Sequence, residues 1–308
     1  DIRARTVIKY LKKHLEGKPI IVSRYMPAGG GTLAANFMAQ KAKRDGLTIG
    51  NIGSSMFPNA ILKSRGVRYK LDDFIFLGSP SPGNPYTLVI TPKLKLTTAE
   101  EVKAHDGLRF GQRSVGHAMY ILDRVIAYVL DLKNPKWVLG YSSSELPIAV
   151  EKGEVDAQSQ SIPGILRGTP QWLNEGFGFP VVIRNAAGQG TEAVPAFPQG
   201  LPYLESFADN DMKKKILQFN NAIRPAAAPY FVPKGVPEPA LKALKTAFNK
   251  IWNDPNFAAD YKKATAGEDA VPISGEKIEE VLASRPKDPE VMKVYRQLIG
   301  AGPIPSSK

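Results

Sequence analysis

The pattern of apolar and polar positions alternates between segments with helical spacing and short strand-like runs. Apolar residues recur at helical spacing, which predicts helices, over residues 3–15, 32–43, 118–130 and 240–252. Runs rich in β-branched and aromatic residues predict strands over residues 19–23, 48–52, 74–78, 86–90, 108–111, 137–140, 155–158, 179–183 and 230–232. Because helices and strands alternate, we expect an α/β protein with parallel sheets built from crossover units.

Polar residues mark the starts of several shorter helices. Thr98 is expected to cap a helix over residues 98–104, with Glu100 and Glu101 favourably placed in its first turn. Ser144 is expected to cap the helix that follows it. Further short helices are expected over residues 57–64, 144–152, 163–167, 276–284 and 289–299.

The order of these elements repeats once along the chain, which predicts two α/β lobes. We expect the first lobe to span residues 1–96 and the second lobe residues 97–223. Residues 224–308 form a helical tail that is expected to pack on the first lobe, because its apolar stripes need a surface to bury against. The connections between lobes are expected near Pro92 and Arg224. Ligands of such folds bind at strand ends and domain interfaces, so we expect a ligand cleft between the lobes.

Composition narrows the classes of function. The chain has a formal net charge of +12 and a pI of about 9.6, and such a field attracts anions. Its Lys and Arg residues are dispersed and match no nucleic-acid motif, so no nucleic-acid partner is expected. The absence of cysteine excludes disulfides and thiolate chemistry. No apolar run reaches the roughly 18 residues of a membrane span.

A run of three glycines separates the first predicted strand from a helix. Such turns bring backbone N–H groups close to an anion or polar ligand. Gly29, Gly31 and Ala34 match the loose dinucleotide pattern G-x-G-x-x-A. However, the second strand ends at Gly53 without the carboxylate that this pattern requires, and five residues separate the first strand from the glycines. A nucleotide-dependent enzyme using the Gly29–Ala34 turn is therefore the alternative to a binding protein.

Polar residues also gather after the predicted strands of the second lobe. His117 could act as a base, but no acid nearby in sequence would orient it, which favours a capping or ligand-binding role. The hydroxyls of residues 142–144 could cap a helix or bind a carboxylate. The amides and hydroxyls of residues 158–161 are typical of an ordinary polar loop or of a cleft lining. Paired carboxylates and metal-ligand spacing are absent from the sequence, so we expect no catalysis, no metal and no cofactor.

Six blocks of sequence, in order, carry a family resemblance. They are VSRYMPAGGGTLAANFMAQKAKRDGLTI from Val22, the turn Gly53-Ser54-Ser55, RFGQRSVGHAMY from Arg109, LGYSSS from Leu139, GEVDAQSQSIPG from Gly153 and VPKGVPEPALKAL from Val232. Over essentially its whole length the chain thereby resembles the periplasmic solute receptors of tripartite tricarboxylate transporters, the Bug-type family.

The resemblance implies a two-lobed α/β fold like that of periplasmic binding proteins, with the ligand cleft between the lobes. It implies a periplasmic, monomeric solute-binding protein without enzymatic activity. Such a receptor captures a small organic carboxylate and delivers it to the membrane components of a secondary transporter. The matching blocks make the candidate ligand-binding residues Ser54, Ser55, Arg113, Ser114, Gly116, His117, Tyr141, Ser142, Gln158 and Gln160.

The chain departs from the family pattern in two ways. The family begins with a further strand and a Gly-rich loop, and this sequence starts at what looks like the aspartate that ends the loop, Asp1. We expect that segment, like a signal peptide, to be missing from the sequence rather than from the protein. Gln160 stands where the family often has an aspartate, and Arg113 adds a cation. Both changes favour plain or multiple carboxylates. Which carboxylate is bound, and by which transporter it is received, stays open.

Overall fold

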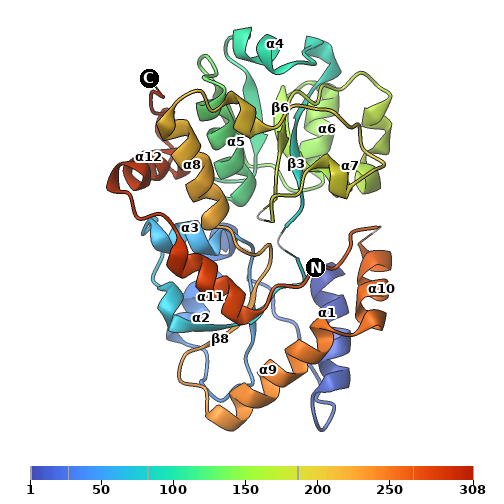
Figure 1. Cartoon of the computed structure of the whole chain (residues 1–308), viewed down its shortest axis with the longest axis vertical. Coiled ribbons are helices and arrows are strands. Elements are labelled where there is room, and N and C mark those ends of the chain that lie inside the picture. The colour runs from blue at the N-terminus through green and yellow to red at the C-terminus, as the bar shows by residue number, and fades with distance from the viewer. Residues whose placement is uncertain (1, 27, 82, 186, 266, 308) are drawn as a thin grey trace. The chain divides into compact units, whose positions relative to one another are not determined.

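The chain divides into two compact units, each built on one β-sheet. The computed structural model describes residues 2–26, 28–81, 83–185, 187–265 and 267–307 (Figure 1). Unit 1 comprises Asp1–Gly83 and Ile223–Arg285, and unit 2 comprises Asn84–Ala222 and Pro286–Lys308. The three boundaries place every candidate binding residue except Ser54 and Ser55 in unit 2.

The unit boundaries differ from the expected lobes at two places. The chain leaves unit 1 at Gly83, before the strand that precedes Pro92. Helix α12 (Pro289–Ile299) belongs to unit 2 rather than to the first lobe. The reason is its packing: the ring of Tyr295 lies edge-on to Phe219 at a centroid distance of 5.1 Å, and its hydroxyl donates to Asn220 Oδ1 at 2.7 Å.

The sheet of unit 1 has three strands in the order β1-β8-β2, all antiparallel. They are β1 (Gly50–Asn51), β2 (Phe74–Gly78) and β8 (Tyr230–Pro233). The expectation of a parallel sheet is therefore wrong for this unit. The reason is that β8 returns to the sheet from the distant second part of the unit and runs between β1 and β2 in the opposite direction.

Side chains of β8 alternate between two hydrophobic clusters, one on each face of the unit 1 sheet. Tyr230 and Val232 pack with α1 (Ile2–His14), α9 (Glu238–Trp252) and α10 (Pro255–Ala264). Phe231 packs against the other cluster, with its ring centroid 4.6 Å from that of Phe74. The helices of that second face are α2 (Thr32–Gln40), α3 (Met56–Ile61) and α11 (Gly275–Ser284).

Two further sequence predictions in unit 1 are wrong. Residues 19–23 form no strand, and Ile20 and Val22 are 87% and 83% exposed. A strand needs a neighbouring backbone to pair with, and no described residue pairs with this segment. In α2 the buried residues are Ala35 and Met38, whereas Leu33, one of the apolar residues at helical spacing that predict the helix over residues 32–43, is exposed instead of buried.

Unit 2 has a five-stranded mixed sheet in the order β5-β4-β6-β3-β7. Strand β4 pairs in parallel with β5 and with β6, as expected for crossover units, while β3 is antiparallel to β6 and β7. The strands are β3 (Tyr86–Ile90), β4 (Arg109–Gln112), β5 (Lys136–Leu139), β6 (Ala157–Ser161) and β7 (Val182–Ile183). The parallel prediction therefore holds only for the three strands that are joined by helical crossovers.

Helices cover both faces of the unit 2 sheet. Helix α5 (Ala118–Val129) packs on β4 and β6 and is itself covered by α8 (Asp211–Ala222) and α12 (Figure 1). The other face carries α6 (Glu145–Lys152) and α7 (Ile162–Gly168), whose apolar side chains share a cluster with Val89 and Trp172. Helix α8 was not predicted from the sequence. Among the described residues, no helix combines the length and the apolar character needed to cross a bilayer.

Thr98 caps α4 (Ala99–Ala104) as the sequence predicts. Its hydroxyl accepts from the Glu101 amide at 3.3 Å, and the Glu101 carboxylate accepts from the Thr98 amide at 2.9 Å, which completes a capping box. We expect Thr98→Ala to lower the free energy of unfolding by about 1 kcal/mol. Urea denaturation of the variant measures this, and Thr97→Ala is the matched control. An equal or larger loss in Thr97→Ala would contradict this role.

Candidate functional site

The candidate residues of unit 2 gather at one edge of its sheet. Because β4, β5 and β6 run parallel, their carboxyl ends lie at the same edge. The turn 113–117 follows β4, the loop 140–144 follows β5, and Gln160 lies near the end of β6. The fold thereby brings together candidates that are up to 47 residues apart in sequence. We call this edge, with the turn 113–117, the loop 140–144 and Gln160, the rim of unit 2.

The turn after β4 presents Arg113 and His117 together. The His117 amide donates to the Ser114 carbonyl at 3.2 Å, which closes the turn. Gly116 has a φ of +77°, a conformation that disfavours residues with a Cβ. Arg113 Nη1 lies 3.4 Å from His117 Nε2. The side chain of Arg113 is exposed, so both nitrogens are within reach of a ligand.

The loop after β5 is tied directly to this turn. The Gly140 amide donates to the Arg113 carbonyl at 3.1 Å, and the Tyr141 amide donates to the Gln112 carbonyl at 3.3 Å. Arg113 Nη2 also donates to Ser143 Oγ. Ser143 therefore orients the guanidinium, a role that was not assigned to it from the sequence. The run of three serines was the available signal, but the sequence alone did not say which hydroxyl would meet Arg113.

Ser142 caps helix α6. Its hydroxyl accepts from the Glu145 amide at 3.3 Å, and its amide donates to Glu145 Oε2 at 2.8 Å. That backbone hydrogen bond is the main cause of a lowered pKa of Glu145. Ser144, which was expected to cap this helix, makes no side-chain cap. The hydroxyl of Ser142 thus already serves the helix, while Tyr141 is half-buried at the rim.

The electrostatics of the turn keep His117 neutral. Burial and the neighbouring charge of Arg113 lower the pKa of His117 to about 4. His117 Nδ1 accepts from the Met119 amide at 3.3 Å at the start of α5. A neutral imidazole has one N–H, so its proton is on Nε2. Two donors, His117 Nε2–H and Arg113 Nη1–H, therefore face the same small space.

The two glutamines of β6 differ in their surroundings. Gln158 is 2% exposed, and its Nε2 has no hydrogen-bond partner among the described residues. Gln160 is half-buried, and its Oε1 accepts from the Ser161 amide at 3.3 Å. Gln160 therefore lies at the rim, whereas Gln158 lies deeper in the sheet, where its unpaired donor costs stability unless a partner supplies an acceptor.

Beneath the rim, α5 carries two buried charged residues that sequence reasoning missed. Asp123 is fully buried and accepts hydrogen bonds from Gln112 Nε2 and Ser159 Oγ. Arg124 is also fully buried and donates to the Leu298 carbonyl in the last turn of α12. The adjacent Asp-Arg pair inside an otherwise apolar helical run was the signal that could have revealed them.

Asp123 makes stability depend on pH. Burial raises its pKa to about 7, although hydrogen bonds from Ser159 and Gln112 lower it. The folded protein thus keeps a proton that the unfolded chain releases near pH 4. We expect the free energy of unfolding to fall between about pH 4 and 7, by up to about 1.4 kcal/mol per pH unit. Urea denaturation at several pH values should show this slope in the wild type. A slope that persists in Asp123→Asn would contradict the assignment.

In unit 1, the glycine run forms a short 3-10 turn, Ala28–Gly31, before α2. Gly31 has a φ of +95°, and a Cβ there would approach Ile52 Cγ2 to 2.6 Å. Ser55 is buried and donates from its hydroxyl to the Gly30 carbonyl at 3.1 Å. Ser55 thus holds the glycine turn, while Ser54 is half-buried. The dinucleotide pattern needs a strand directly before the glycines, and residues 19–26 form none, so the nucleotide alternative finds no support here.

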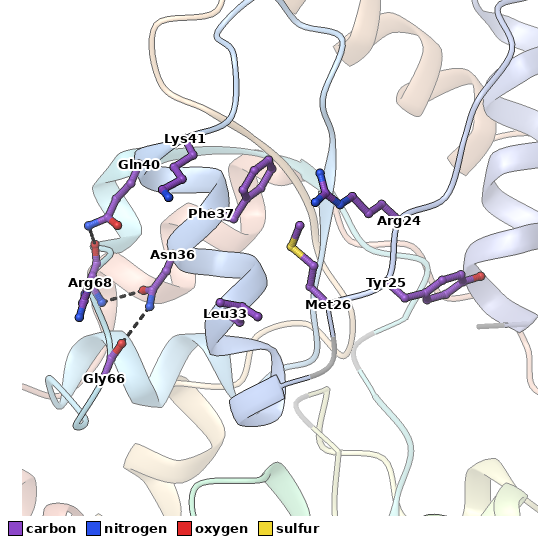
Figure 2. A pocket seen from close by; sticks show the side chains of 10 residues that line it. All are labelled: Arg24, Tyr25, Met26, Leu33, Asn36, Phe37, Gln40, Lys41, Gly66 and Arg68. Carbon is purple, nitrogen blue, oxygen red and sulfur yellow. Dashed lines mark hydrogen bonds between the residues drawn. The ribbon is translucent and has the colours of Figure 1, made fainter.

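Unit 1 also carries a surface groove of about 570 Å³ between α2 and the loop around Gly66. Figure 2 shows Asn36 reaching toward this loop: its Nδ2 donates to the Gly66 carbonyl at 2.9 Å, and its Oδ1 accepts from the Arg68 amide at 2.7 Å. The guanidinium of Arg24 lies over Phe37 at 5.5 Å. None of the candidate binding residues lines this groove. Within the described ranges, no group of three or more His, Asp or Glu side chains could hold a metal ion.

Comparison with known proteins identifies the fold through structure rather than sequence. No family model matches the chain, and a search of the curated proteins finds no match. The periplasmic binding protein BugD superposes with a TM-score of 0.68 at 16% identity, covering 97% of this chain and 92% of BugD. A TctC solute-binding protein from Polaromonas gives 0.64 at 16% identity, covering 97% and 92%.

A third solved structure, MatC from Rhodopseudomonas palustris with bound malate, gives a TM-score of 0.65 at 19% identity. It covers 97% of this chain and 93% of MatC. At these identities the likeness concerns the fold, and it extends over nearly the whole length of both proteins. The mixed α/β architecture with two sheet-based units is therefore that of the TctC- and Bug-type periplasmic solute receptors.

Proposed function

We propose that the chain is a solute-binding protein that captures a small organic carboxylate for a membrane transporter of the tripartite tricarboxylate type. The observation that carries the proposal is the 3.4 Å approach of Arg113 Nη1 to His117 Nε2. In the neutral tautomer whose Nδ1 accepts from the Met119 amide, His117 Nε2 carries the proton, so the two nitrogens are both donors and cannot satisfy each other. A carboxylate oxygen accepts from both, and its second oxygen is available to further donors of the rim.

The candidate residues around this point suit an anion, because none of them has an acidic side chain. Arg113 supplies the single charge, which is held in place by Ser143 Oγ. Ser114, Gly116, Tyr141 and Gln160 lie on the segments that surround it. A charged guanidinium with fixed geometry recognises a carboxylate more specifically than a flexible ammonium group does. MatC, which shares this fold, binds malate.

The proposal includes release of the ligand chemically unaltered. A histidine acts as a catalytic base when an acid orients it and a nucleophile or substrate proton faces it. Among the described residues, His117 Nδ1 accepts a backbone N–H instead, and the charge of Arg113 helps to keep its pKa near 4. These contacts fit a hydrogen-bond donor better than a proton acceptor.

Location and partners belong to the same proposal. The solved structures that share the fold include the periplasmic binding protein BugD. We propose a periplasmic, monomeric receptor whose partners are its carboxylate ligand and the membrane components of a secondary transporter. Size-exclusion chromatography with light scattering tests the monomer, and a dimer at micromolar concentration would contradict it.

Isothermal titration against a panel of acids tests the binding function. The panel contains malate, succinate, citrate and benzoate, with malamide as a neutral analogue. We expect at least one acid to bind with micromolar or tighter affinity and the neutral analogue not to bind. Failure of every acid to bind, or recovery of a chemically changed ligand, would overturn the proposal.

A further inference from the structure

The buried carboxyl group of Asp123 connects two strands that carry the rim. Asp123 lies on the inner face of α5, and one carboxyl oxygen accepts from Gln112 Nε2, at the end of β4. The other oxygen accepts from Ser159 Oγ, in the middle of β6. Gln112 directly precedes Arg113, and its carbonyl accepts from the Tyr141 amide at 3.3 Å. Asp123 is therefore hydrogen-bonded to the residue that immediately precedes Arg113, the proposed carboxylate contact.

Among the described residues, no cation forms an ion pair with Asp123. Charged side chains also lie on α5 itself and on the elements packed against it. Some of them pair with other groups, and none of them shifts the pKa of Asp123, which is set by burial and by hydrogen bonds from Ser159 and Gln112. Arg109 on β4 pairs with Asp156, and Lys213 on α8 pairs with Asp131 and Asp209. Arg124 donates to the Leu298 carbonyl in the last turn of α12. The remaining charged groups on these elements are Asp211, Lys214 and Lys215 on α8, Glu205 in the turn Leu204–Phe207, and Glu290, Lys293 and Arg296 on α12.

The surroundings of Asp123 can accept a proton without rearrangement of the backbone. A protonated carboxyl group has one O–H that must find an acceptor. Gln112 Oε1 is buried and has no hydrogen-bond partner among the described residues. A rotation of the Gln112 side-chain amide would present this oxygen to the Asp123 O–H, while Ser159 Oγ continues to donate to the other carboxyl oxygen.

We propose that Asp123 takes up a proton when the carboxylate ligand binds at the rim above it. This inference rests on the proposed function and extends it: the cargo is an anion together with a proton held by the protein. Burial brings the pKa of Asp123 to about 7, which places this exchange near neutral pH. An approaching anion disfavours the ionised carboxylate. For two charges about 10 Å apart at an effective dielectric constant of about 20, the coupling is on the order of tenfold in affinity.

Isothermal titration in buffers of different ionisation enthalpy measures the coupling, with malate or the best-binding acid of the panel as the probe. Binding to the wild type should take up about half a proton near pH 7.5, and affinity should fall about tenfold between pH 6 and 9. In Asp123→Asn, which keeps the size of the side chain, both effects should vanish and affinity should stay near the low-pH value of the wild type. His14→Gln and His105→Gln, which replace the two histidines that are not candidate binding residues, are controls and should leave the proton uptake unchanged.

A measurement without ligand separates this inference from the proposed function. The side-chain amide signals of Gln112 in the NMR spectrum of the free protein should titrate with a midpoint near 7. A midpoint near 4, or ligand binding without proton uptake in the wild type, overturns the inference and leaves the carboxylate receptor intact. Absence of binding by every acid overturns both. The wild-type data decide these points even if Asp123→Asn fails to fold.

Discussion

Replacement of Arg113 by alanine is expected to weaken carboxylate binding by about ten- to a hundredfold. The reason is that Arg113 is the one charged donor on the turn after β4, and a charge-assisted hydrogen bond is worth roughly 1.5–3 kcal/mol. The side chain of Arg113 is exposed, and the hydrogen-bonding neighbours of its guanidinium within the described ranges are Ser143 and His117, so the fold should not depend on it. Isothermal titration of the best-binding acid measures the loss.

Two variants separate the charge of Arg113 from its geometry. Arg113→Lys keeps the positive charge but loses the planar fork, and should retain part of the affinity. Ser143→Ala leaves the guanidinium in place without its hydroxyl partner, and should weaken binding by less than Arg113→Ala. Affinity within twofold of the wild type in Arg113→Ala would show that the carboxylate binds elsewhere.

Replacement of Arg124 by alanine should lower the free energy of unfolding by about 3–5 kcal/mol. Arg124 Nε donates to the Leu298 carbonyl at 2.7 Å, and Nη2 donates to the carbonyls of Gln297 and Gly302 at 3.0 and 2.7 Å. Its guanidinium also lies 5.2 Å from the ring centroid of Trp137. The substitution leaves a cavity and removes the donor to the carbonyl of the buried Leu298, and such losses are among the largest that single substitutions cause.

Matched variants identify which part of this contact matters. Tyr120→Phe removes only the hydroxyl that donates to the Gly300 carbonyl at 2.7 Å, and should cost about 1 kcal/mol. Arg124→Met restores most of the packing without the donors and should lie between the two. Urea denaturation gives all three values. A loss below about 1 kcal/mol in Arg124→Ala would contradict the anchoring of the segment after α12.

Local sequence patterns predicted most of the individual elements. Strands β2 and β3 were predicted at their observed bounds, because short β-branched and aromatic runs end there at Gly, Pro or Thr. The cap of α4 followed from Thr98 and Glu101. These features depend on residues close together in the chain, which a sequence presents directly.

Features that depend on distant partners were not predictable in this way. Residues 19–23 have the composition of a strand, but pairing decides whether a strand forms, and none of the described segments pairs with them. The direction of β8 depends on how the chain returns to unit 1 after unit 2. Both outcomes are set by tertiary contacts that the local pattern does not contain.

The candidate site shows the same division. The family resemblance named residues on the three segments that meet at the rim of unit 2. It did not separate Ser142, which caps α6, from Ser143, which contacts Arg113. It also missed Asp123, because a buried carboxyl group is recognised only when its neighbours Gln112 and Ser159 are known.

A crystal structure with the best-binding dicarboxylate tests the central claim most directly. The account predicts one carboxylate of the ligand within about 3 Å of both Arg113 Nη1 and His117 Nε2, with the ligand chemically intact. Density for the ligand in contact with neither residue, or for a reaction product, would contradict it.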